Sequence, residues 1–321
     1  MTVRYELIEL LSDGRFHSGE DLAARLGVTR AAVWKQVRSL EGLGFDIQAV
    51  RGKGYRLAAP LELLDAGHIR RELGELPVAD VRVLREVDST NTWLRQAAMR
   101  GAPSGSLCLA EYQHRGRGRR GRSWVSPFGA NICLSLLWRF ATGPGRLSGL
   151  SLASGVAVLR ALQGIGAAEL ALKWPNDIFA AGAKLAGILV EIDGEATGPS
   201  QAVIGIGCNV RMTHVTGPQL DRPWISLHAL GVDVSRNGLA AGLIKETIGM
   251  LQQFESSGLA AFVDEWRARD LLAGRPVVVD TPTGTVEGVS ESIDAEGALL
   301  VRQGRRLLRF FSGEVSLRAA S

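Results

Sequence analysis

The chain has 321 residues, of which 46% are hydrophobic and 22% charged, and its formal net charge is +4. These ordinary values exclude a wholly disordered chain, and the length suggests two or three domains. No apolar run approaches the about 18 residues of a membrane span, and acidic residues interrupt the apolar N-terminus, unlike a signal peptide. We therefore expect a cytoplasmic protein with no membrane partner.

The rarer residue types narrow the chemistry. The cysteines, at 108, 133 and 208, and the five histidines show no spacing typical of a disulfide framework or a metal site. We expect buried free thiols and no metal held by His or Cys. Among the 37 Lys and Arg residues, only positions 35, 53, 173, 184 and 245 are lysines. In such a chain a lysine indicates a place that needs a compact ammonium.

The first sixty residues predict a winged helix-turn-helix. Helices are expected over 3–11, 20–26 and 30–43, with a tight turn at Gly27, and short strands over 45–48 and 55–57 flank a basic Gly turn. Pro60 and the polar residues after it indicate a domain boundary. A protein-docking module with a solvated basic face is the alternative. Candidate DNA-binding residues are Ser18, Thr29, Arg30, Ala31, Trp34, Lys35, Arg38 and Lys53.

From about residue 65 the pattern changes to a mixed α/β domain. Short β-rich runs over 81–87, 107–111, 131–138, 184–192 and 202–210 alternate with helical segments, most clearly 147–162 and 239–254. From about 273 only short strands are expected, over 276–280, 285–289, 298–302 and 307–311.

The segment 113–122, QHRGRGRRGR, holds five arginines and no acid. Its GxGxxG pattern runs into Ser-Trp-Val-Ser-Pro rather than opening a helix, which excludes a dinucleotide-binding loop. A flexible cationic loop that grips phosphate or carboxylate oxygens fits the residues. A nucleic-acid patch and a solvated charge run are the alternatives.

Four other segments place candidate ligand-binding residues at the ends of strands. Residues 88–91, DSTN, lie between a strand and a helix, where they cap the helix and also offer donors to a polar ligand. Residues 173–177, KWPND, form a turn that either carries site residues or is held by an ion pair. Lys184 leads a buried strand and needs an anionic partner. Gly205 and Gly207 end another strand and are expected to let a flat ligand approach the backbone.

Taken in order behind the winged helix-turn-helix, segments 88–91, 113–129, 173–177, 184–188, 205–209 and 313–318 resemble the biotin protein ligases, specifically the bifunctional biotin–protein ligase/biotin operon repressors. The resemblance covers essentially the whole chain. It implies a winged helix-turn-helix DNA-binding domain over 1–64, an α+β (mixed α/β) catalytic domain over 65–272 and a C-terminal SH3-like β-barrel over 273–321.

The resemblance also implies two chemical steps. Biotin and ATP, with Mg²⁺, give biotinyl-5′-AMP and pyrophosphate, and a lysine of the biotin carboxyl carrier protein of acetyl-CoA carboxylase then accepts the biotinyl group. Operator DNA is an implied partner, and the adenylate is an implied corepressor that makes the protein a homodimer.

The family's site positions carry over onto named residues. Biotin-binding positions fall on Ser89, Thr90, Asn91, Gln113, Arg117, Gly118, Arg119 and Lys184. ATP-binding positions fall on Arg120, Arg122, Lys173, Asp177, Asn209, Trp224 and Arg318. Catalysis is expected from Lys184, Arg119, Arg117, Asp177 and Lys173, with Lys184 bridging the biotin carboxylate and the α-phosphate and Asp177 a candidate magnesium ligand.

Two positions depart from the family pattern. Trp34 is bulky where the best-known relatives carry a small polar residue, and Cys133 stands where an aromatic residue is usual. Two other functions stay open: an effector-sensing transcription factor without ligase activity, and a lipoate-type ligase, whose substrate lacks the ureido group of biotin.

Overall fold

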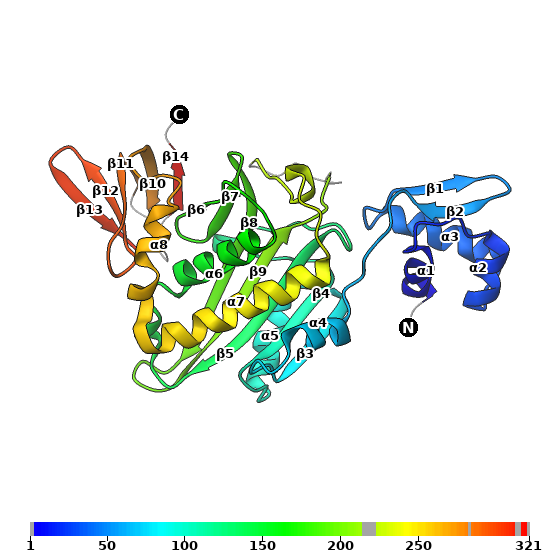
Figure 1. Cartoon of the computed structure of the whole chain (residues 1–321), viewed down its shortest axis with the longest axis horizontal. Helices are drawn as coiled ribbons and strands as arrows, with labels where there is room; N and C mark the ends of the chain where they lie inside the picture. Colours follow the sequence, from blue (N-terminus) through cyan, green and yellow to red (C-terminus); the bar gives the residue numbers. More distant parts are fainter. Residues whose placement is uncertain (1–2, 214–222, 282–283, 312–315, 320–321) are drawn as a thin grey trace.

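The computed structural model describes residues 3–213, 223–281 and 284–311, together with the backbone of 316–319. At its N-terminus, three helices pack beside a two-stranded hairpin, as predicted (Figure 1). They are α1 (Val3–Leu11), α2 (Gly19–Leu26), α3 (Arg30–Glu41), β1 (Ile47–Val50) and β2 (Gly54–Leu57). The Ser18 hydroxyl caps α2 and the Thr29 hydroxyl caps α3. Gly27 ends α2 in the left-handed region, with φ +63°, where glycine carries no steric penalty.

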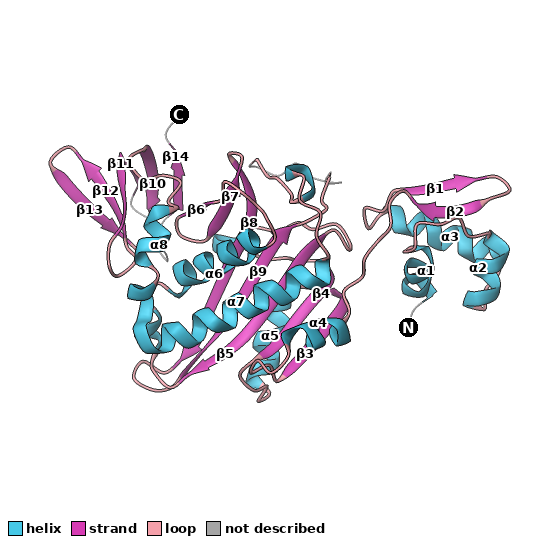
Figure 2. Ribbon diagram, in the orientation of Figure 1, coloured by secondary structure: helices cyan, strands magenta, loops and turns pink. Residues whose placement is uncertain are grey.

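A seven-stranded sheet forms the centre of the molecule (Figure 2). Its strands are β3 (Asp80–Val87), β4 (Ser106–Gln113), β5 (Asn131–Phe140), β6 (Ala171–Lys173), β7 (Asp177–Ala180), β8 (Ala183–Gly194) and β9 (Ser200–Asn209). They lie in the order β3-β4-β5-β9-β8-β7-β6, and β3 with β4 is the parallel pair. Strands β5 and β9 therefore lie side by side, although about 60 residues of chain separate their ends. This pairing brings Asn131 opposite Asn209.

Helices cover both faces of this sheet (Figures 1 and 2). They are α4 (Ala66–Leu73), α5 (Thr90–Met99), α6 (Leu150–Gly164), α7 (Arg236–Ser257) and α8 (Val263–Ala268), with single 3₁₀ turns at Arg119–Gly121, Pro144–Leu147, His228–Leu230 and Gly258–Ala261. Leu136 packs in the core with α6 and α7, whereas Leu137 packs with α5. Because successive residues of a strand point to opposite faces, α5 lies across the sheet from α6 and α7.

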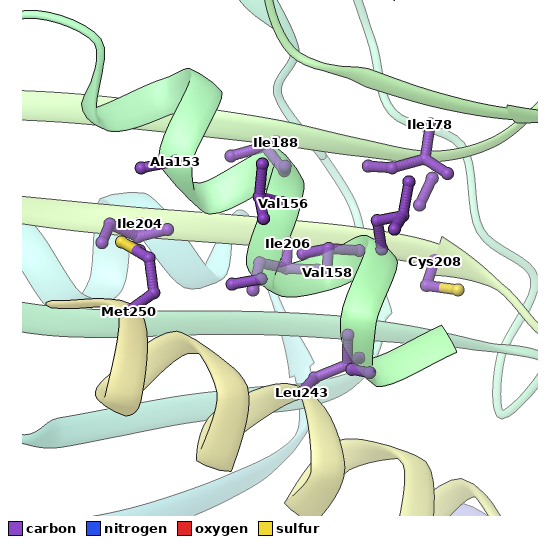
Figure 3. Packing of buried hydrophobic residues seen from close by; sticks show 14 of the residues in the cluster. Ala153, Val156, Val158, Ile178, Ile188, Ile204, Ile206, Cys208, Leu243 and Met250 are labelled. Carbon is purple, nitrogen blue, oxygen red and sulfur yellow. The ribbon is translucent and has the colours of Figure 1, made fainter. Parts of the chain in front are cut away.

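The main core lies between the sheet and the helices α6 and α7. Figure 3 shows Val156 and Val158 of α6 and Leu243 and Met250 of α7 against sheet residues such as Ile206, and all of these side chains are buried. The helix predicted over 239–254 extends to 236–257, and the one predicted over 147–162 begins later, at Leu150, after a 3₁₀ turn. None of the described helices is long and apolar enough to cross a membrane.

The C-terminal segment forms a five-stranded antiparallel sheet. Its strands are β10 (Pro276–Thr281), β11 (Gly284–Ile293), β12 (Leu299–Gln303), β13 (Arg306–Phe310) and β14 (Ser316–Ala319), in the order β13-β12-β11-β10-β14. Val277, Val279, Ile293 and Leu299 belong to the same buried cluster as α6 and α8. The small sheet is thus packed into the central core rather than tethered beside it.

The N-terminal module also packs against the central sheet. Phe128, from the segment that follows the arginine loop, is 4% exposed and lies in the core of the module. Its ring stacks with Tyr5 at 6.3 Å between centroids and lies 5.3 Å from that of Phe45. Arg4 and Glu86 form an ion pair of 2.6 Å at the same interface.

The segment 58–65, which joins the N-terminal module to the central domain, is bonded to a buried ion pair. The Arg236 and Glu111 side chains are both fully buried, and they meet at 2.8 Å. Glu111 also accepts a hydrogen bond from the Leu64 backbone, and Arg236 donates to the carbonyl of Glu62. Buried charges of this kind need such partners, so the network restrains the chain between the two units.

Candidate functional site

A cavity of about 690 Å³ opens between the arginine loop, the start of α5 and the β7–β8 hairpin. It brings together residues that are far apart in the sequence. Fourteen of the fifteen residues predicted to bind biotin or ATP line it: Ser89, Thr90, Asn91, Gln113, Arg117, Gly118, Arg119, Arg120, Arg122, Lys173, Asp177, Lys184, Asn209 and Trp224. The fifteenth, Arg318, has its side chain outside the described residues.

One wall of the cavity is a buried polar cluster at the start of α5. Ser89 caps the helix, and Gln113 Oε1 accepts hydrogen bonds from the Thr90 backbone at 2.8 Å and the Thr90 hydroxyl at 3.2 Å. The Ser135 hydroxyl lies 2.8 Å from Thr90 Oγ1 and 2.6 Å from Asn91 Oδ1. Ser135 was not among the predicted site residues, because only the pairing of the strands brings it under the helix. The cluster can bind a compact polar group with several donors and acceptors.

The opposite wall carries an ion pair. Lys184 Nζ lies 2.6 Å from Asp177 Oδ1, and their side chains are 26% and 13% exposed. Lys184 is held by its own backbone as well, since its N–H and carbonyl bond to Pro223 and Ile225 on either side of Trp224. A Cβ at Gly187 would lie 2.9 Å from Lys184 Nζ, so glycine leaves the space that the ammonium occupies.

The arginine loop lines one side of the cavity, and its cations have different partners. Arg117 pairs with Glu191 on β8 at 3.0 Å rather than with a group at the centre of the cavity. Burial lowers the pKa of Arg119, an effect that Asp177 opposes and the neighbouring Arg120 and Arg122 reinforce. A partly buried guanidinium of this kind is suited to bind an anion. Glu191 was not predicted, because no local pattern links it to the loop.

Trp124 is a further cavity residue that the sequence did not reveal. Its ring covers the backbone of Gly207, where a Cβ would lie 2.5 Å from the ring, and Lys184 Nζ lies 5.7 Å from the ring centroid. A Cβ at Gly205 would lie 2.1 Å from Asn91 Oδ1. Both glycines line the cavity, and the absence of a Cβ at each also makes room for a protein side chain, so their contact with a flat ligand stays a prediction.

Asn209 and Lys173 also have protein partners. The Asn209 amide donates to the Ile225 carbonyl at 3.0 Å, so it holds the segment next to Trp224. Lys173 Nζ lies 5.2 Å from the centroid of the Phe179 ring. In the antiparallel pairing of β6 and β7, the backbone of Lys173 lies opposite that of Asp177. Both side chains still line the cavity, and their roles with a nucleotide stay predictions.

Cys133 also lines the cavity, where its thiol is buried, and all three cysteines are free. Among the described residues, no three His, Cys, Asp or Glu side chains are grouped as a metal site would require. The expected free thiols are confirmed.

The predicted DNA-binding face lies on α3 and the hairpin. Ala31, Trp34, Lys35 and Arg38 are exposed on α3, and Trp34 keeps 54% of its surface exposed. The Arg38 guanidinium lies 5.4 Å from the Trp34 ring centroid, and Lys53 Nζ of the hairpin lies 5.9 Å from that of Phe16. Ser18 and Thr29 serve as helix caps, and Arg30 lies 3.8 Å from Glu20.

Comparison with known proteins matches three parts of the chain to family models. Residues 3–56 match the HTH domain, 83–209 the Biotin/lipoate A/B protein ligase family and 273–318 the Biotin protein ligase C terminal domain. The bifunctional ligase/repressor BirA of Escherichia coli is 44% identical over 319 residues, which are 99% of this chain and 98% of that protein. The protein of the same name from Bacillus subtilis is 31% identical over 98% of this chain and 99% of its own length.

A solved structure shows the same fold. The biotin protein ligase from Aquifex aeolicus in complex with biotin and ATP is 26% identical, with a TM-score of 0.65 over 75% of this chain and 99% of that one. The resemblance stated from the sequence is confirmed by matches that run along nearly the whole chain. This chain belongs to the biotin protein ligase family, among its bifunctional ligase/repressors.

Proposed function

We propose that this chain couples biotin to a carrier protein in two steps and represses transcription in its adenylate-bound form. In the first step a biotin carboxylate oxygen attacks the α-phosphorus of ATP and pyrophosphate leaves. In the second, the ε-amine of a carrier lysine attacks the acyl carbon and AMP leaves. The carrier would be the biotin carboxyl carrier protein of acetyl-CoA carboxylase. The observation that supports this most is the convergence of Lys184, Asp177 and the arginine loop on one cavity.

The first step brings two anions together, and this cavity supplies cations for it. Lys184 offers a compact ammonium at one wall, and Arg119 offers a partly buried guanidinium in the loop. Fixed charges in a partly dry site stabilise developing negative charge more than water does. In our proposal Lys184 bridges the carboxylate and the α-phosphate, Arg117 and Arg119 close over them, and Arg120 and Arg122 bind pyrophosphate.

The polar cluster at α5 supports biotin over lipoate. A ureido ring has both donors and acceptors, and burying it without partners is costly. Ser89, Thr90 and Gln113 present such partners in a buried wall. Lipoate has no group that would use them, so biotin should compete with lipoate for the cavity and win.

Magnesium would enter with the nucleotide. In nucleotide sites Mg²⁺ is held by phosphates and by one or two carboxylates. Asp177, whose carboxylate lines the cavity, fits that role as a single protein ligand. The ion would then offset phosphate charge while Asp177 and Lys184 stay adjacent.

The chain as a whole would work as three domains, over 1–64, 65–272 and 273–321, the last an SH3-like barrel that brings Arg318 toward ATP. In the adenylate-bound homodimer, two recognition helices α3 would reach two half-sites of the operator DNA. A cytoplasmic location belongs to the same proposal and is supported by the three free thiols.

One experiment tests both activities together. Purified chain is incubated with carrier protein, biotin and MgATP, and carrier labelling is followed while sedimentation reports the mass of the chain. We expect labelled carrier, and a dimer only when biotin and MgATP are both present. An effector-sensing transcription factor would dimerise without labelling carrier, and that outcome would refute the ligase proposal.

A further inference from the structure

The turn of residues 173–177 makes a hydrogen bond to the C-terminal sheet. Trp174 is 2% exposed, and its ring Nε1–H donates to the carbonyl of Gly297 at 3.2 Å. Gly297 lies in the turn between β11 and β12, more than 120 residues further along the chain. A side chain next to Lys173 is therefore fixed by a different sheet from the one that carries Lys173.

The acceptor turn is held by several hydrogen bonds of its own. The Asp294 carboxylate accepts hydrogen bonds from the backbone of Glu296 and of Ala298, each at 2.9 Å, and Arg309 Nε donates to it at 2.7 Å. Gly297 has φ +82°, and a Cβ there would lie 2.7 Å from a methyl of Leu152. The carbonyl that faces Trp174 is thus held by the turn on one side and by α6 on the other.

Two other contacts hold the same hairpin. The Ser151 hydroxyl of α6 donates to the Pro175 carbonyl at 3.2 Å, and the Asn176 amide donates to the Ile188 carbonyl at 2.6 Å. They restrain the tip of the turn. The Trp174 bond restrains its first strand, where Lys173 lies directly opposite Asp177.

We propose that Trp174 is a positioning residue for the first chemical step: through Gly297 it fixes the hairpin that places Lys173 and Asp177 at the cavity. This inference rests on the proposed ligase function. Asp177 in turn holds Lys184 at 2.6 Å, so a shift of the hairpin would move the ammonium as well. A misplacement of about 1 Å at a reacting centre can cost up to about 100-fold in rate.

The test is a pair of matched substitutions. Trp174→Phe keeps an aromatic ring but removes the ring N–H. The Gly297 carbonyl then loses the hydrogen bond that it accepts from Trp174. Trp138→Phe is the control, because Trp138 is also buried and its Nε1 has no partner among the described residues. Biotin-dependent ATP–pyrophosphate exchange is measured for both variants and for the wild type, with thermal unfolding to check that each is folded.

We expect Trp174→Phe to lower kcat at least about tenfold and to change KM for biotin by a smaller factor, because the displaced Lys184 meets only the biotin carboxylate while the wall of Thr90 and Gln113 is untouched. Trp138→Phe should keep wild-type kcat. Equal kcat for Trp174→Phe and wild type would overturn the inference, and so would equal losses in both variants. A wild type that performs no exchange would instead overturn the proposed function.

A double-mutant cycle approaches the same contact from the other side. Asp294→Asn loosens the acceptor turn without touching the central sheet. If Trp174 acts through that turn, the double variant should have nearly the kcat of Trp174→Phe alone, since interacting residues are non-additive. Additive losses in kcat would contradict the coupling, even if each single variant is impaired.

Discussion

Lys184 Nζ and Asp177 Oδ1 form an ion pair of 2.6 Å at the start of two adjacent strands, β8 and β7. The ammonium proposed to meet the biotin carboxylate therefore has a protein carboxylate as a neighbour. Asp177 keeps the partly buried charge in place and orients it toward the cavity. Asp177 also makes the position of the Lys184 ammonium sensitive to any change in the hairpin that bears Asp177.

Replacing Lys184 by alanine should remove most adenylate formation. Loss of one fixed donor at a reacting centre typically costs about 100- to 1,000-fold in kcat. Biotin-dependent ATP–pyrophosphate exchange measures the effect. Lys245→Ala is the matched control, since Lys245 is exposed on α7, away from the cavity. Normal exchange by the Lys184 variant would remove the residue from the mechanism.

Arg119→Gly should weaken retention of the adenylate. A hydrogen bond to a charged group contributes about 1.5–3 kcal/mol, so release of biotinyl-5′-AMP should accelerate roughly tenfold or more. Activated biotin would then escape and label bystander proteins. Arg115→Gly in the same loop serves as control, because Arg115 does not line the main cavity. An unchanged dissociation rate of the adenylate would count against the assignment of the loop.

The buried pair of Arg236 and Glu111 should contribute strongly to stability. Arg236→Met removes the nearer of the two cations beside buried Glu111 and leaves only Arg85, whose Nη1 lies 4.0 Å from Oε1, so it should lower the free energy of unfolding by about 3 kcal/mol. Urea denaturation measures this loss. Arg82→Met breaks an exposed pair with Asp80 and should change the same quantity by less than about 1 kcal/mol. Similar losses in the free energy of unfolding for the two variants would show that burial does not make the Arg236–Glu111 pair more stabilising than an exposed pair.

The cysteines should be inert in the folded chain. Burial raises the pKa of the Cys133 thiol to about 11 and that of Cys208 to about 12. Between an unfolded pKa of about 8.5 and these values, the unfolded chain binds fewer protons than the folded one, so the free energy of unfolding falls as pH rises. An aromatic disulfide reagent at pH 8 should react slowly before urea is added and with three thiols afterwards. Fast reaction of the folded chain would contradict this burial.

Trp34 should affect the DNA sequence that the module selects. Its exposed indole lies beside Arg38 on the outer face of α3, where recognition helices contact base edges. Trp34→Ser should alter the preferred bases in a selection from random duplexes, while the salt dependence of binding stays unchanged because no phosphate contact is lost. Identical selected sequences for variant and wild type would exclude a reading role for Trp34.

Much of this molecule follows from short-range patterns. The caps at Ser18 and Thr29 and the left-handed turn at Gly27 depend on neighbours within a few residues, so the sequence predicted the helix-turn-helix closely. The ligand-binding candidates could be named one segment at a time, because strand ends and glycine-rich loops carry recognisable residues. Their placement around one cavity agrees with the family resemblance.

Other features arise only from the tertiary structure. Ser135 lies under Thr90, Glu191 holds Arg117, and Trp124 covers Gly207, yet none of these pairs is close in sequence. Which residues meet depends on the order of strands in the sheet and on how the loop folds over it, and hydrophobic periodicity does not encode either.

The sequence alone therefore determined the kinds of elements, the caps and the candidate chemistry, because local backbone preferences and residue types suffice for these. The tertiary structure decided which charges are paired, which glycines make room for side chains and how the C-terminal sheet reaches Trp174. Those relationships depend on contacts between distant segments, and such contacts form only when the whole core packs.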